Sequence, residues 1–154
     1  MYFYNLMIDM SKNKNVDLYV DMDGVIAEYG INKNNPYDYK NKRPLNQNIK
    51  TLEEVSKIDG INLYVLSVCR EDYQVNDKNE WLDKNAPFFK KENRIIISRS
   101  SKDWMDSKSI KLDFLMGVKS ENQVAVLDDD NAVLREIKEK IKTIIVMQDS
   151  ELID

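Results

Sequence analysis

The stretch "LYVDMDGVIAEYG" (residues 18–30) indicates the fold, because an apolar run ends in two aspartates one residue apart, followed at once by glycine. Such an apolar run predicts a buried β-strand. Side chains alternate along an extended chain, so we expect Asp21 and Asp23 on the same side, with Met22 pointing away. Gly24 permits the backbone to turn sharply out of the strand. The stretch therefore predicts a buried strand that ends in a pair of carboxylates.

Four further runs resemble this strand in being almost continuously apolar and rich in β-branched residues, a pattern typical of strands buried on both faces. The five expected strands are residues 16–20, 61–68, 94–98, 123–127 and 143–147. Between them, apolar residues recur at spacings of three and four, which predicts helices. The expected helices are residues 45–58, 75–84, 110–115 and 133–141. This alternation predicts an α/β protein with a doubly wound, Rossmann-like parallel sheet.

The chain of 154 residues is long enough for one domain with a sizeable core. We expect an N-terminal extension or edge strand over residues 1–15 and a single domain over residues 16–154. Residues 1–15 lack the basic start and the cleavage site of a signal peptide. The polar segment 28–44 exceeds the usual length of a loop between a strand and a helix, so we expect a small cap or loop insertion there.

The composition excludes several kinds of chemistry. The sequence has no histidine, which excludes His-based triads, His-ligated zinc and His general bases. The single cysteine, Cys69, cannot form an intramolecular disulfide, and there is no apolar run of about 18 residues that could span a membrane. These features favour a cytoplasmic protein without a membrane partner. Segment 85–112 is basic although the net charge is −4, either as a solvated surface or as an approach for an anionic substrate.

Acidic and hydroxyl side chains follow three of the expected strands. Asp21 and Asp23 follow the first strand, and Ser67 ends the second. The strand 123–127 is followed by Asp128, Asp129 and Asp130. Ligands bind beyond the carboxyl ends of the strands in open parallel sheets. Carboxylates gathered there repel one another unless a cation lies among them, and oxygen ligands without His or Cys favour Mg²⁺.

Each acidic motif also has a purely structural interpretation. Asp-x-Asp-Gly often forms only a turn after a strand, and an acidic run such as residues 128–130 often caps the following helix. A calcium loop does not fit, because glycine stands at the fourth position and an apolar strand precedes the motif. The two motifs together favour a reactive site. One aspartate can attack phosphorus, and its neighbour can protonate the leaving oxygen and later activate water.

Four segments together resemble the motifs of the haloacid dehalogenase superfamily, which consists mostly of Mg²⁺-dependent phosphohydrolases. They are "YVDMDGVIAE", "LYVLSVC", a downstream lysine and "VAVLDDD", spread over residues 16–147. The resemblance implies that Asp21 is the nucleophile and a metal ligand. It implies that Asp23 is the general acid and base and offers its backbone carbonyl to the metal. Ser67 would hydrogen-bond the phosphoryl group, and Asp128 with Asp129 would hold Mg²⁺.

The third motif of the superfamily is a lysine at the start of a helix near the site. Lys108 begins the helical pattern 110–115 and is our first choice for this catalytic role. Lys111 is the second choice and a candidate for binding the substrate phosphate, and Lys102 is the third. All three lysines lie in the basic segment 85–112.

Two groups within the superfamily have similar motifs. "DMDGVIAE" is similar to the opening of the 5′(3′)-deoxyribonucleotidases. "SVCRE" and "KDWMDSK" are similar to segments in the phosphatase domain of polynucleotide kinases, which implies that Arg70 binds substrate phosphate. The short segment between the first two motifs implies a minimal cap and an open site, which a macromolecular phosphate end could enter or a homodimer could complete. Tyr29, Tyr37 and Tyr39 could stack on a base there or simply anchor the loop.

We therefore expect a Mg²⁺-dependent phosphomonoesterase that forms an aspartyl-phosphate on a nucleotide or nucleic-acid-end substrate. The alternatives are a phosphatase of a phosphoprotein or a small metabolite, a catalytically silent binding module, and a receiver-type signalling domain. A receiver has its acid pair after the first strand and its phosphorylated aspartate in mid-chain, whereas nothing acidic ends the strand 94–98 here. A silent module usually lacks the nucleophile or a metal acid, and this sequence has both. The order of the motifs thus favours the enzyme.

Overall fold

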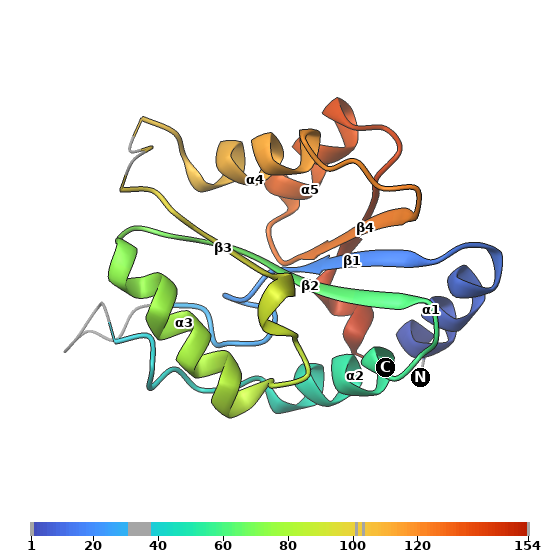
Figure 1. Ribbon diagram of the computed structural model, residues 1–154, viewed down its shortest axis with the longest axis horizontal. Coiled ribbons are helices and arrows are strands. Elements are labelled where there is room, and N and C mark those ends of the chain that lie inside the picture. The colour runs from blue at the N-terminus through green and yellow to red at the C-terminus, as the bar shows by residue number, and fades with distance from the viewer. Residues whose placement is uncertain (1, 31–37, 101, 103, 154) are drawn as a thin grey trace.

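The computed structural model describes residues 2–30, 38–100, 102 and 104–153, and within them five parallel strands form one sheet in the order β3-β2-β1-β4-β5. The strands are β1 (Val16–Val20), β2 (Ile61–Cys69), β3 (Arg94–Ser98), β4 (Gln123–Asp128) and β5 (Ile145–Gln148). Helices flank this sheet on both faces (Figure 1). The doubly wound α/β fold expected from the sequence is confirmed.

The helices divide between the two faces of the sheet. One face carries α1 (Tyr2–Asn13), α2 (Asn46–Ser56) and α3 (Asp72–Asn85). The other face carries α4 (Ser107–Met116) and α5 (Asn131–Lys140). The short 3-10 helices are η1 (Lys91–Asn93) and η2 (Asp149–Leu152). Across the described part of the chain, no helix combines the length and the apolar character that crossing a membrane requires.

Capping residues explain why α3 and α4 begin earlier than their apolar spacing indicates. At the start of α3, the side chains of Glu71 and Gln74 form a capping box with the backbone. At the start of α4, the Asp106 carboxylate accepts a hydrogen bond of 2.7 Å from the backbone N–H of Ser109. Polar residues thus extend both helices beyond the periodic apolar part from which they were predicted.

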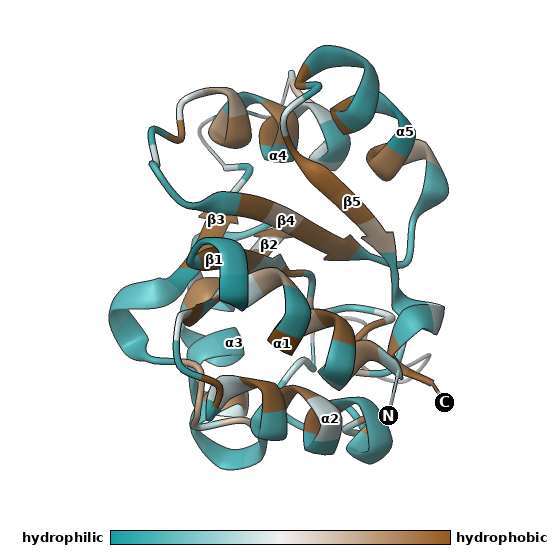
Figure 2. Cartoon of the chain, turned by 90° about the vertical axis from the view of Figure 1, so that its right-hand side faces the viewer, coloured by the Kyte–Doolittle hydropathy of each residue, from teal (hydrophilic) through white to brown (hydrophobic). Residues whose placement is uncertain are grey.

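The central strand β1 supplies side chains to two apolar clusters, one on each face of the sheet. Val16, Leu18 and Val20 pack with residues of α1, α2 and α3, whereas Tyr19 packs with residues of α4 and α5. This alternation follows the period of two along a strand. All five residues of β1 are buried, which accounts for the almost continuous apolar run in the sequence. Figure 2 shows the apolar strands between the two helical layers.

The pairing register aligns the carboxyl ends of β1 and β4, whereas β2 continues beyond them. Val20 lies opposite Val65 of β2 and opposite Leu127 of β4. The backbone N–H of Asp21 donates to the carbonyl of Leu127 at 3.0 Å, which continues the pairing beyond the last residue of β1. Asp21 and Asp128 are therefore neighbours at one edge of the sheet.

The N-terminal segment forms the helix α1, so the expected alternative of an edge strand is wrong. Phe3 and Met7 lie one helical turn apart, and both are buried in the apolar cluster under β1. The side-chain amide of Gln123 donates to the carbonyls of Met10 and Lys14 at 2.9 and 3.0 Å. This ties the end of α1 to the start of β4. The spacing of the apolar residues, which is four rather than two, is the reason for a helix.

We predict that Met7→Ala lowers the free energy of unfolding by about 2–4 kcal/mol, because the side chain is fully buried and its truncation leaves a cavity. The matched control is Met116→Ala, since Met116 is 64% exposed, and we expect it to change stability by less than about 0.5 kcal/mol. Urea unfolding followed by circular dichroism measures both values. Equal stability of the two variants would contradict the packing of α1 in the core.

Candidate active site

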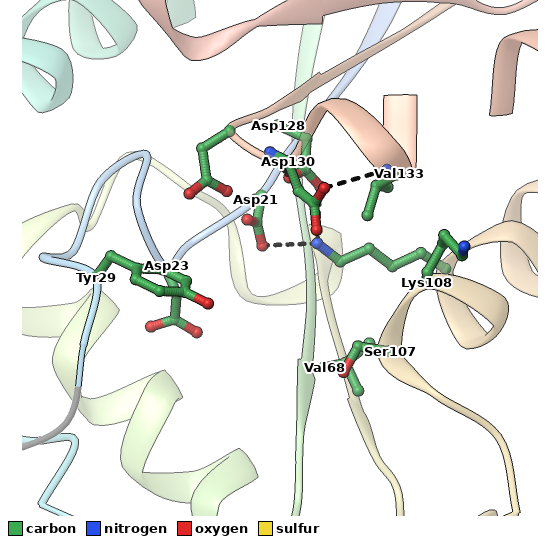
Figure 3. A pocket seen from close by; sticks show the side chains of 11 residues that line it. Asp21, Asp23, Tyr29, Val68, Ser107, Lys108, Asp128, Asp130 and Val133 are labelled. Atoms are coloured by element: carbon green, nitrogen blue, oxygen red, sulfur yellow. Dashed lines mark hydrogen bonds and ion pairs between the residues drawn. The ribbon is translucent and has the colours of Figure 1, made fainter. Parts of the chain in front are cut away.

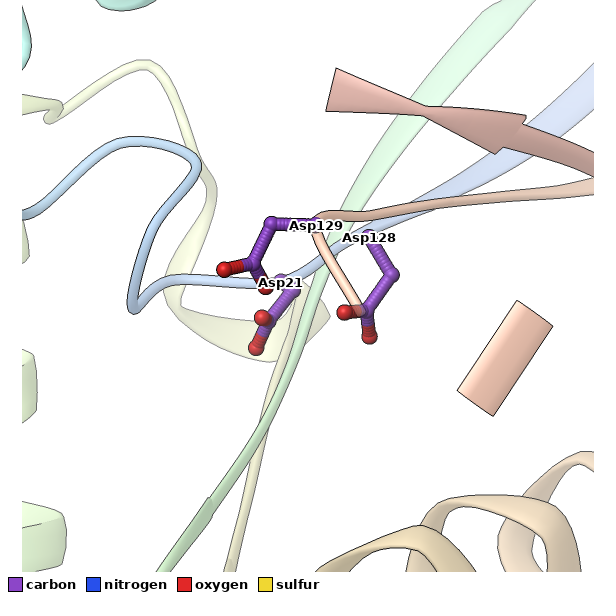
Figure 4. Close-up of side chains that lie close together, drawn as sticks. All are labelled: Asp21, Asp128 and Asp129. Carbon is purple, nitrogen blue, oxygen red and sulfur yellow. The ribbon is translucent and has the colours of Figure 1, made fainter. Parts of the chain in front are cut away.

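Three carboxylates meet at the carboxyl edge of the sheet. Asp21 follows β1, Asp128 ends β4 and Asp129 comes next, and one oxygen of each lies within 4.8 Å of the other two (Figure 4). Asp21 and Asp128 are buried, and Asp129 is half-buried. This cluster could bind a metal ion. A donor set made only of carboxylate oxygens fits a hard cation such as Mg²⁺, as the sequence predicts.

Gly24 makes room for this cluster. Its φ of +84° lies in the left-handed region, and a Cβ at this position would come within 2.1 Å of Oδ2 of Asp129. The backbone N–H groups of Ile26 and Ala27 donate to the carbonyl of Met22 at 2.9 and 3.0 Å, which forms the sharp turn expected after β1. Glycine is needed here both for the turn and for the close approach of Asp129.

Lys111 of α4 joins two of the three carboxylates. Its Nζ lies 2.9 Å from Oδ1 of Asp21 and 2.8 Å from Oδ2 of Asp128, and the lysine itself is buried. Burial works to lower the pKa of Lys111, but the two carboxylates outweigh it and raise that pKa. Burial raises the pKa of Asp21 to about 8, with Lys111 opposing and Asp128 adding to the shift. Burial and the charge of Asp128 raise the pKa of Asp129 to about 6. The single ammonium group of Lys111 therefore offsets only part of the negative charge of the three carboxylates.

Asp23 has a separate pair of cationic partners. Its Oδ1 lies 2.9 Å from Nζ of Lys42, and its Oδ2 lies 3.2 Å from Nζ of Lys78. Burial works to raise the pKa of Asp23, but Lys78 and Lys42 outweigh it, so that pKa is lowered. Asp21 and Asp23 both line the pocket while Met22 is buried, as the period of two predicts. The side chain of Asp23 stands outside the three-carboxylate cluster, and the metal contact expected of its carbonyl stays a prediction.

Sequence reasoning missed Lys78, which is buried on α3. Its Nζ also donates to Oγ of Ser67 at 2.7 Å and to the carbonyl of Val68 at 3.1 Å. A signal was present in the sequence, because Lys78 lies three and four residues before Trp81 and Leu82. A lysine on the apolar face of a helix indicates a buried cation with acidic or carbonyl partners.

The acids and lysines surround a pocket of about 390 Å³ (Figure 3). Tyr29 lines it from the segment 28–44, and Lys108 lines it from α4. Lys108 is partly exposed, and its Nζ lies 3.9 Å from the carboxylate of Glu136 on α5. Lys108 therefore stands at the wall of the pocket, whereas Lys111 contacts the carboxylates directly. Asp130 caps α5 by accepting a hydrogen bond of 2.9 Å from the N–H of Ala132.

Other residues expected at the site lie away from the pocket. Ser67 is fully buried against Lys78, and Arg70 is exposed after β2, and neither is among the described residues that line the pocket. Their phosphate-binding roles stay predictions that rest on the resemblance alone. Lys102, the third choice for the motif lysine, is half-buried in the loop before α4 and also stands outside this lining.

The tyrosines of the segment 28–44 have different surroundings. Tyr29 is 79% exposed at the pocket. Tyr39 is buried, and its ring packs edge-on against Trp81 with 6.1 Å between the ring centres. Tyr39 thus anchors its segment, whereas Tyr29 is accessible for stacking. Tyr37 lies outside the described residues.

Comparison with known proteins identifies solved structures of similar architecture. No family model and no curated protein matches the chain. A solved structure described as the Pnkp1/Rnl/Hen1 RNA repair complex contains a chain that is similar to this one, with a TM-score of 0.66 and 19% sequence identity. The match covers 91% of this chain and 44% of that chain, so this chain spans less than half the length of its structural neighbour. The similarity shows a shared α/β fold.

We predict that Gly24→Ala weakens binding of Mg²⁺ and Mn²⁺ by about tenfold or more, because the added methyl group displaces the carboxylate of Asp129. Gly30→Ala is the matched control, since Gly30 also has a positive φ of +115° but, among the described residues, no atom within 4 Å of its Cβ position. Both variants carry a backbone strain of about 1 kcal/mol, and only Gly24→Ala alters the cluster. Isothermal titration calorimetry measures the affinities. Equal affinities of the two variants would show that Asp129 does not hold the cation.

Proposed function

We propose that the protein is a phosphomonoester hydrolase of the haloacid dehalogenase type that requires a divalent cation, with Mg²⁺ as the natural choice. The observation that carries this proposal is the contact of Asp21 with Lys111 beside Asp128 and Asp129, at the carboxyl edge of a parallel sheet. A buried carboxylate that faces a pocket, next to a lysine and a cation-binding cluster, suits attack on an anionic phosphoryl group.

In the first step, an oxygen of Asp21 attacks the phosphorus atom. The bond between phosphorus and the leaving oxygen breaks, and an aspartyl-phosphate forms on Asp21. Asp23, which lines the same pocket between the ammonium groups of Lys42 and Lys78, relays a proton from these groups to the leaving oxygen. Asp21, Asp128 and Asp129 would hold a divalent cation, which would supply positive charge to offset the charge of the phosphoryl group.

In the second step, Asp23 takes a proton from a water molecule, which attacks the phosphorus atom. The bond between phosphorus and Asp21 breaks, and inorganic phosphate leaves with the nucleophile restored. Lys111 stays beside Asp21 and Asp128 throughout and limits their mutual repulsion. We therefore assign the role of the third-motif lysine to Lys111 rather than to Lys108.

The preferred substrates in this proposal are nucleotides or the phosphate ends of nucleic acids. Two observations support this class. The structural neighbour belongs to a complex described as acting in RNA repair, and the exposed ring of Tyr29 at the pocket offers a surface on which a base could stack. A phosphatase of a phosphoprotein or a small metabolite is the alternative, and a substrate panel separates them.

We predict that the wild type releases phosphate from 4-nitrophenyl phosphate only with Mg²⁺ present, and that Asp21→Asn lowers kcat by at least about 10⁴-fold by removing the nucleophile. Malachite-green detection of phosphate measures this release.

A panel of nucleoside 5′- and 3′-monophosphates, 3′-phosphorylated oligonucleotides and a phosphopeptide ranks the substrate classes. Full activity of Asp21→Asn would exclude the mechanism, and a folded wild type that binds Mg²⁺ yet hydrolyses none of them would favour the silent binding module.

We predict that Lys111→Met lowers kcat by about 10²-fold, because the ammonium group that lies between Asp21 and Asp128 is then lost. Lys108→Met is the comparison, and we expect a loss of about threefold or less, as for a partly exposed ion pair. Steady-state kinetics with 4-nitrophenyl phosphate gives both values. The reverse order of the two losses would return the role to Lys108.

A further inference from the structure

Building on the proposed function, we propose that Trp104 is a stacking surface for the second nucleotide of a single-stranded substrate, so that the protein prefers a strand end to a mononucleotide. Trp104 lies in the loop between β3 and α4 and is 78% exposed, whereas Trp81 is 1% exposed in the core. A single exposed apolar side chain is ordinary on a protein surface. The loop, the pocket and the charges around Trp104 indicate what this one does.

Hydrogen bonds hold the loop that carries Trp104. The backbone N–H of Arg99 donates to the carbonyl of Cys69 at 2.8 Å, which ties the start of the loop to the end of β2. Nε of Arg99 donates to the carbonyl of Met105 at 3.1 Å, and the N–H of Met105 donates to the carbonyl of Lys102 at 2.9 Å. The backbone is therefore held next to Trp104 while the indole ring stays exposed. A ring placed in advance loses little conformational freedom when a ligand binds.

Trp104 stands close to the pocket. It lies three residues before Ser107, which lines the pocket, so their Cα atoms are at most about 11 Å apart. The loop between β3 and α4 lies at the same end of the sheet as the turn after β1 (Figure 1). Tyr29, which follows this turn, is also exposed and lines the pocket itself. Two exposed rings from different strand ends thus flank one pocket, as stacking of two successive bases requires.

The charges at this end of the sheet suit a polyanion. Three acids already have partners within the protein: Glu71 in the capping box of α3, Asp106 in the cap of α4, and Asp72, which accepts a hydrogen bond from the hydroxyl of Ser100. The basic side chains of the same two loops and of the start of α4 include exposed Arg70, half-buried Lys102 and partly exposed Lys108. Positive charge of this kind attracts the phosphates of a nucleic-acid backbone. It favours the interpretation of the basic segment 85–112 as an approach for an anionic substrate.

A strand and a mononucleotide differ in the rings that they can contact. The base next to the scissile phosphate can stack on Tyr29 at the pocket. A second base, which only a strand has, can then stack on Trp104. Loss of the indole therefore weakens the binding of a strand far more than the binding of a mononucleotide. A general loss of structure would weaken both.

The binding test uses the full chain and unphosphorylated hexathymidylate, which has no phosphomonoester to hydrolyse. We expect hexathymidylate to quench the part of the tryptophan emission that Trp104→Phe removes. Fluorescence anisotropy of labelled hexathymidylate should give a Kd about tenfold higher for Trp104→Ala than for the wild type. Tyr2→Ala, which alters an exposed aromatic residue of α1, is the control and should change Kd by less than about twofold. The affinity should fall as the salt concentration rises.

The kinetic test compares hexathymidylate that carries a terminal phosphate with thymidine monophosphate. We expect Trp104→Ala to raise KM by about tenfold on the strand and by less than about twofold on the mononucleotide. Tyr29→Ala should raise KM on both substrates, because its ring serves the first base. Equal losses of Trp104→Ala on the two substrates would overturn the proposal, since they would show a general defect.

Hexathymidylate that leaves the emission of Trp104 unchanged, or that binds Trp104→Ala as tightly as the wild type, would also overturn the proposal. A phosphopeptide that quenches this emission while hexathymidylate does not would assign the surface to a protein partner instead. Hydrolysis of 4-nitrophenyl phosphate tests the phosphatase function without any base, and the binding test needs no hydrolysis. A failure of the Trp104 inference is therefore distinguishable from a failure of that function.

Discussion

The site depends on one electrostatic constraint, which is that Asp21 and Asp128 stay buried side by side. Two buried carboxylates repel each other, and leaving one buried charge without a partner typically costs roughly 3–5 kcal/mol. The ammonium group of Lys111, on α4, lies within 2.9 Å of an oxygen of each carboxylate. Its single charge compensates the two carboxylates only in part, so the cluster of Asp21, Asp128 and Asp129 retains an attraction for a cation.

The order of the strands explains why the cluster forms where it does. From β1 the chain passes to β2 and β3 on one side, and it then returns to β4 and β5 on the other side of β1. Connecting helices leave the sheet in opposite directions at this point, which opens a crevice at the carboxyl ends of β1 and β4. The hydrogen bond from the backbone N–H of Asp21 to the carbonyl of Leu127 aligns the ends of β1 and β4. Gly24 then lets Asp129 approach without a steric clash.

The sequence predicts the features that depend on neighbours along the chain. The apolar runs give the strands, their alternation with helices gives the fold, and the acids after β1 and β4 give the cluster. Features that depend on the rotation of a helix against the sheet are not predicted in this way. Lys108 and Lys111 lie on the same helix, and only the packing of Ile110 and Leu115 decides which lysine faces the carboxylates. Lys78 and Lys42 were missed for a related reason, since lysines are mostly exposed and their partners lie far away in the sequence.

Two aspartates separated by one residue thus come to occupy opposite electrostatic settings. Burial raises the pKa of Asp21, whereas Lys78 and Lys42 outweigh the burial of Asp23 and lower its pKa. A cation bound by Asp21, Asp128 and Asp129 would act against the shift of Asp21 and favour its ionised, nucleophilic form. The segment before α2 contributes directly to this difference, because the indole N–H of Trp81 donates to the carbonyl of Lys42 at 2.9 Å and places its ammonium group beside Asp23. Residues 39–44 therefore help to hold one of the two aspartates.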